Sequence, residues 1–104
     1  MPVIGQATTP TITYLAPEDL DMTTTRNIYF TLSQGERKIT KTGSDLFVTA
    51  SSVGVYLSQR DTVWLDPDRE AKHQLNWTFS DGRRGMTREK IIEIDPNLLP
   101  EVLA

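Results

Sequence analysis

Cysteine is absent from this chain of 104 residues, and histidine occurs only once, at His73. The absence of cysteine excludes disulfides and thiolate metal ligands, so the fold must be held together by packing. It also means that the sequence does not indicate whether the protein works in an oxidising or a reducing compartment. The scarcity of histidine leaves His73 without another histidine to share a metal ion. Because His73 stands at the start of a strand-like run, we expect it to lie on the surface.

Long apolar runs and a surplus of basic residues are lacking as well. No stretch approaches the roughly 18 apolar residues that a membrane helix needs, and residues 1–6 have neither the basic start nor the apolar core of a signal peptide. The formal net charge of −3 disfavours binding to nucleic acid by phosphate neutralisation. We therefore expect a protein made in the cytoplasm, with neither membrane nor nucleic acid among its partners.

Sequence patterns that carry chemistry are also missing. No serine lies in the Gly-x-Ser-x-Gly elbow of hydrolases. The pairs Asp19/Asp21 and Asp66/Asp68 lack the other ligands of a calcium loop, so we interpret these aspartates as turn residues. The sequence thus predicts a protein that is not an enzyme and that has no cofactor or metal site.

The clearest pattern that is present covers residues 73–94. Leu75, Trp77 and Phe79 alternate with polar residues, which is typical of a strand with one buried face. Asp81 and Gly82 follow, and a second strand is expected from about residue 86 to residue 94. This arrangement predicts a β-hairpin with a type I′ turn, because Asp and Gly both tolerate the positive φ angles of that turn.

Further strand-like runs recur with the spacing of an all-β fold. They lie at residues 27–33, 37–41, 46–50 and 53–57, and no helical pattern of about ten residues or more interrupts them. Ser58 and Asp61 predict one capped helical turn that tucks Trp64 or Leu65 under the sandwich. The predicted fold is an all-β, immunoglobulin-like antiparallel β-sandwich of about seven strands, with Trp77 in the core instead of the usual disulfide.

The first 25 residues differ in character from the rest. Their strand-like island at residues 11–15 lies between Pro10 and Pro17, which favours an extended arm or an edge strand. We expect an extended N-terminal arm over residues 1–25 and a β-sandwich domain over residues 26–104. Such an arm can add a strand to a neighbouring subunit, so its deletion is expected to leave a folded monomer that no longer assembles.

Five residues are candidates for a partner-binding surface. Tyr14 belongs to the expected arm, and Tyr29 and Tyr56 fall on outward strand faces. Arg83 and Arg84 lie at the hairpin tip, and arginine is enriched in protein interfaces. A row of exposed aromatic rings or a calcium site would instead favour a carbohydrate-binding or adhesin-like sandwich module.

Residues 26–103 also carry features of a known family. These are the strand at 27–32, the stretch Val-Tyr-Leu-Ser-Gln-Arg-Asp-Thr-Val-Trp at 55–64, Gln-Leu-Asn-Trp at 74–77, Asp81-Gly82 with Thr87 following, and Leu-Pro-Glu-Val-Leu at 99–103. The most specific part is residues 57–62 followed by the Gln-x-x-Trp strand. In these features the chain resembles small phage domains typified by the N-terminal domain of the upper baseplate protein of siphophages.

That resemblance implies an immunoglobulin-like sandwich that attaches baseplate or tail-fibre parts to a phage tail. It implies a non-enzymatic structural protein that is made in the bacterial cytoplasm and becomes a tail, baseplate or connector component of a phage or prophage virion. Its partners would be other virion structural proteins or further copies of the same chain.

Overall fold

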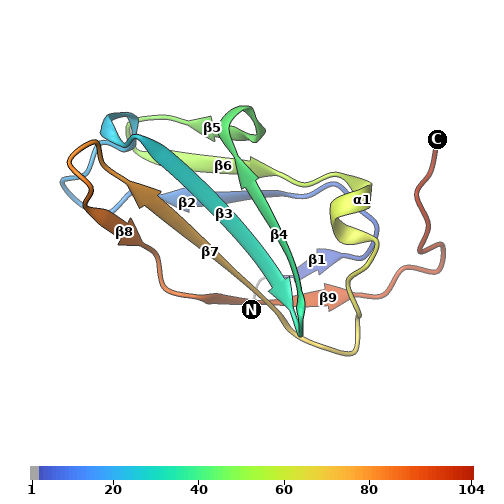
Figure 1. The fold of residues 1–104 in the computed structure, drawn as a ribbon. Coiled ribbons are helices and arrows are strands. Elements are labelled where there is room, and N and C mark those ends of the chain that lie inside the picture. Colours follow the sequence, from blue (N-terminus) through green and yellow to red (C-terminus); the bar gives the residue numbers. More distant parts are fainter. Residues whose placement is uncertain (1–2) are drawn as a thin grey trace.

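The computed structural model describes residues 3–104, which fold into two β-sheets packed face to face (Figure 1). The nine strands are β1 (Val3–Gly5), β2 (Thr11–Leu15), β3 (Asn27–Gln34), β4 (Arg37–Thr42), β5 (Leu46–Val48), β6 (Ser52–Tyr56), β7 (Ala71–Thr78), β8 (Arg84–Met86) and β9 (Lys90–Asp95). Three short helical turns join them: η1 (Met22–Thr24), η2 (Gly43–Asp45) and α1 (Gln59–Thr62). The larger sheet has the order β1-β9-β7-β3-β4, with β8 beside β7, and the smaller has the order β2-β6-β5.

This strand order is that of an immunoglobulin-like sandwich, so the predicted fold class is confirmed. The described strands pair antiparallel except for β1 and β9, which are parallel. Residues 3–104 contain nine strands, whereas about seven were expected. The sequence did not predict β1, because three residues are too few to show an alternating pattern, and the last predicted strand is divided into β8 and β9.

The core lies between the two sheets and is built from alternating residues of their central strands. Phe30 and Leu32 of β3 are completely buried, as is Val55 of β6, and Leu75 and Trp77 of β7 are buried beside them. Each such side chain contributes roughly 1.5–3 kcal/mol through removal of apolar surface from water. The alternation therefore predicted the buried positions of Leu75 and Trp77 correctly, whereas Phe79 lies just beyond β7 and is only partly buried against the core.

Residues 3–25 differ from the extended arm that the sequence predicted. β1 pairs with β9, and β2 forms an edge of the smaller sheet by pairing with β6. Tyr14 and Met22 are buried in the core. Because these side chains fill space between the sheets, this segment is an integral part of the sandwich, and of the two alternatives for residues 11–15 the edge strand is the one observed.

The turn of the hairpin is not the predicted type I′ turn. Gly82 has a positive φ of 90°, but Asp81 has not. The Gly82 amide donates to the carbonyl of Phe79 (3.0 Å), and the Phe79 amide donates to the carbonyl of Arg83 (2.9 Å). The loop therefore has three residues, 80–82, one more than the predicted two-residue turn, with Gly82 in the left-handed position that follows the tight turn.

The strand expected over residues 86–94 is interrupted at Thr87. The Thr87 amide donates to the carbonyl of Leu75 (2.9 Å), while its side-chain hydroxyl accepts from the Leu75 amide (3.1 Å). Gln74 donates to the Thr87 carbonyl (2.9 Å). These side-chain bonds replace regular ladder bonds, so the chain leaves the sheet after β8 and rejoins it at β9.

The capped turn predicted at Ser58 is confirmed. The Ser58 hydroxyl accepts from the Asp61 amide, and the Asp61 carboxylate accepts from the Ser58 amide, which is a complete capping box at the start of α1. Leu65 is buried beyond this turn. Trp64 is only half-buried, and the guanidinium of Arg37 lies 5.5 Å from the centre of its ring.

Candidate functional site

The five residues predicted to bind a partner do not form one surface. Tyr14 is 2% exposed and belongs to the core, so its assignment to the surface was wrong. Tyr56 is exposed on the outer face of the smaller sheet. Tyr29 and Arg84 are exposed on the larger sheet. Arg83 lies at the hairpin tip, where its side chain is bonded to Asp81 (2.7 Å).

Tyr29 and Arg84 are the two predicted residues that the structure brings near each other. Both lie beside Asn76 of β7. Tyr29 is the register partner of Asn76 on β3, and Arg84 donates to the side-chain oxygen of Asn76 (2.9 Å). Met86, the register partner of Asn76 on the other side, is exposed as well. The outer face of the larger sheet therefore mixes apolar and polar groups, as protein-contacting surfaces do.

His73 is buried, so its expected surface position was wrong. It is 5% exposed, and its Nδ1 shares a hydrogen bond with the hydroxyl of Tyr14. The two residues belong to β7 and β2, which lie in opposite sheets. In antibody domains a disulfide joins the two sheets, whereas here a polar side-chain pair does so.

The ionisation of this pair follows from its burial. Burial raises the pKa of the Tyr14 phenol. Burial, and secondarily the positive charge of Lys90, lower the pKa of His73 to about 4. Lys90 also lies 5.3 Å from the centre of the Tyr14 ring. Both members of the pair are therefore uncharged at neutral pH, where they stabilise the sandwich.

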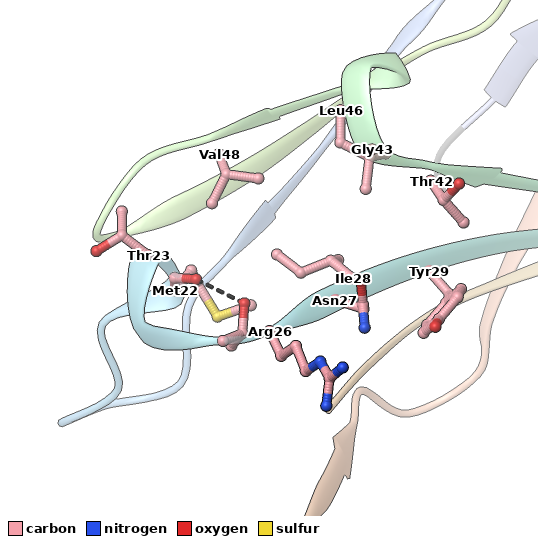
Figure 2. Close-up of a pocket in the computed structure, with 11 residues that line it drawn as sticks. Met22, Thr23, Arg26, Asn27, Ile28, Tyr29, Thr42, Gly43, Leu46 and Val48 are labelled. Carbon is pink, nitrogen blue, oxygen red and sulfur yellow. Dashed lines mark hydrogen bonds between the residues drawn. The ribbon is translucent and has the colours of Figure 1, made fainter. Parts of the chain in front are cut away.

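A cleft of about 500 Å³ lies between η1, the start of β3 and the segment from the end of β4 to β5 (Figure 2). Met22, Ile28, Leu46 and Val48 give it an apolar floor, and polar residues, Arg26 among them, form its rim. In Figure 2 the side chains of Ile28 and Val48 approach it from opposite sides. We call this hollow the edge cleft.

Two sheet edges flank the edge cleft. Within residues 3–104, β4 pairs only with β3, and β5 pairs only with β6, so each strand has one free edge. An extended peptide can form backbone hydrogen bonds with such an edge and place a side chain in a neighbouring pocket. Tyr29 is the one predicted surface residue that lines the cleft. The other residues that line the edge cleft were not predicted from the sequence, because the cleft joins two separate segments, residues 22–29 and residues 42–48.

Two other kinds of site are not found in the described part of the chain. Residues 3–104 contain no group of three or more metal-ligating side chains placed to hold an ion. None of the helices described is long and apolar enough to cross a membrane.

No protein-family model and no curated protein matches this chain. Among solved structures, the chain is similar to that of murine CRIg, with 16% sequence identity and a TM-score of 0.38 over 91% of this chain and 90% of that one. A likeness at this level carries no argument about function, and the fold assignment here depends on the strand order.

Proposed function

We propose that this chain is a non-enzymatic structural component of a phage or prophage virion that attaches to another virion protein through the edge cleft. The observation that carries the attachment is the apolar floor of the edge cleft beside the free edges of β4 and β5. The phage setting comes from the sequence resemblance of residues 26–103.

The geometry suits an extended segment of a partner. Such a segment would add a strand to the edge of β5 and insert an apolar side chain between Ile28 and Val48. Burial of one leucine-sized side chain would contribute roughly 1.5–3 kcal/mol. Arg26 at the rim favours an acidic residue in the partner, since a charge pair there speeds and orients association.

The test is incorporation into particles made by a host strain whose prophage carries the gene. We expect the wild-type chain in purified particles at a fixed ratio to the other structural proteins, measured by quantitative mass spectrometry. Val48→Lys places a charge in the cleft and should abolish incorporation. Ile91→Lys is the matched control, because Ile91 is similarly exposed (43% against 39%) on a strand of the other sheet.

Two results would count against the proposal in different ways. Particles that lack the wild-type chain would contradict the virion role. Particles that contain Val48→Lys at the wild-type level would contradict attachment through the edge cleft. Thermal unfolding of both variants should show that they fold, because Val48 and Ile91 lie outside the buried core.

A further inference from the structure

A second hollow lies on the outer face of the smaller sheet, across β5 from the edge cleft. It measures about 250 Å³ and is lined by Lys41, Asp45, Phe47, Tyr56 and Asp61, with two serines beside them. We call it the aromatic recess. Leu46 and Val48 line the edge cleft, whereas Phe47, between them on the strand, lines the recess, so the two hollows use opposite faces of β5.

Phe47 and Tyr56 present two exposed aromatic rings on the same face of the sheet, and we call this pair the platform. Phe47 is the register partner of Gly54, which lacks a side chain, and atoms of the Phe47 side chain lie within 3.7–4.0 Å of where a Gly54 Cβ would be. The ring therefore lies against the Gly54 backbone while 65% of the residue is exposed. Tyr56, two residues from Gly54 on the same face, is 49% exposed.

Beside the platform, a fixed ion pair supplies hydrogen-bonding groups. Lys41 Nζ lies 2.8 Å from Asp61 Oδ2, and the two side chains are only 20% and 14% exposed. Although burial alone raises the pKa of Asp61, hydrogen bonds from Lys41 and Ser58 lower it overall, so the carboxylate is ionised. In the described part of the chain, Asp61 Oδ1 and two N–H groups of Lys41 are left for a ligand.

We propose that the aromatic recess binds one ring of a neutral saccharide. The C–H face of a pyranose carries partial positive charge and packs on the negative face of an aromatic ring. Its hydroxyls both donate and accept, which matches an ammonium donor and a carboxylate acceptor held side by side. One positive charge (Lys41) and two negative charges (Asp45 and Asp61) line the recess, so the site disfavours acidic sugars. This inference goes beyond attachment and does not depend on the edge cleft.

The test is an NMR titration of the full ¹⁵N-labelled chain with maltose, cellobiose, lactose and chitobiose, each to about 20 mM. A site that binds mainly by stacking and makes few polar contacts discriminates little between neutral pyranoses. We therefore expect at least one of the four sugars to bind with a Kd on the order of 1 mM. Amide shifts should be confined to Phe47, Gly54, Tyr56 and Asp61. Sialyllactose, which is acidic, should bind at least about tenfold more weakly than lactose.

Phe47→Ala and Tyr56→Ala should each weaken binding at least about tenfold. Tyr29→Ala, which removes an exposed tyrosine from the other sheet, should leave the Kd unchanged. The proposal is overturned if none of the four neutral sugars shifts the recess amides. It is equally overturned if the shifts gather on the face of Tyr29, or if Phe47→Ala, folded by its amide spectrum, binds like the wild type.

Discussion

At the level of single residues, the buried pair of Tyr14 and His73 joins the two sheets through polar groups. Burial inside the sandwich disfavours the charged imidazole and lowers the pKa of His73 from the ordinary value of 6.5. Lys90 and the Tyr14 hydroxyl face the ring from β9 and β2, and Lys38, Lys72 and Glu89 line the same hollow as His73. A proton on His73 is therefore opposed in the folded state, and folding is linked to pH.

We expect the free energy of unfolding to fall by up to about 2 kcal/mol between pH 7.5 and about pH 5 because of His73. The folded pKa of His73 is about 4, below that of the unfolded chain, so its contribution is complete above about pH 6.5. It declines as the unfolded chain takes up the proton, and it levels off below about pH 4. Urea unfolding at a series of pH values measures this dependence.

The control for this prediction is His73→Gln, which keeps a polar side chain and cannot take up a proton. The variant should be less stable than the wild type at pH 7.5, but the difference should shrink as the pH falls. Parallel curves for the two proteins would show that another group causes the pH dependence.

The burial of His73 was within reach of the sequence, whereas its partner was not. His73 has the same strand parity as Leu75 and Trp77, so the alternation that predicted the buried face of β7 includes it. Tyr14 lies 59 residues away on the other sheet. A local pattern has no means to specify that pairing, because it depends on how the two sheets pack.

At the level of elements, the hairpin of β7 and β8 is organised around Trp77. Gly85 is its register partner, and a Cβ added at Gly85 would lie 2.3 Å from Trp77 Nε1 and 2.5 Å from Cε2. The indole thus occupies the space of the missing side chain. The glycine at position 85 is therefore explained by this close approach of ring and strand.

Gly85→Ala should lower the free energy of unfolding by about 2–3 kcal/mol, since the buried ring of Trp77 must move to admit a methyl group. Urea unfolding followed by tryptophan fluorescence measures the change. Gly54→Ala is the matched control, because its added Cβ would make only ordinary contacts at 3.7 Å or more. Its effect should stay within about 0.5 kcal/mol. Equal stability of the two variants would contradict the role assigned to Gly85.

The elements that the sequence predicted well are those specified by neighbours in the chain. The capping box needs only Ser58 and Asp61, and the strands β3 and β7 follow from alternation over eight residues each. The elements that it missed depend on distant partners. β1 exists because β9 lies beside it, and the break before β9 depends on Thr87 bonding to Leu75.

At the level of the whole molecule, residues 3–25 are needed to complete both sheets. They supply β1 to the larger sheet and β2 to the smaller one, together with the buried side chains of Tyr14 and Met22. By contrast, the apolar side chains near the other end, Leu98, Leu99, Val102 and Leu103, are exposed. The two ends of the chain therefore contribute very differently to the core.

Deletion of residues 1–25 should leave a chain that does not fold, in contrast to the folded monomer that the sequence alone suggests. Its amide NMR spectrum should lose dispersion, and urea unfolding should lose its cooperative transition. Deletion of residues 98–104 removes a similarly apolar but exposed segment and should preserve both signals. A dispersed spectrum from residues 26–104 would contradict the integral role of β1 and β2.

The parallel pairing of β1 with β9 sets how the molecule responds to force. The ladder runs from Val3–Glu93 to Gly5–Asp95 and is extended by Gln6, whose amide donates to the Asp95 carbonyl (2.9 Å). Tension between residue 3 and residue 95 would pull these strands past each other along their length. The bonds would then be loaded in shear and would have to break together, so the terminal strands act as a mechanical clamp.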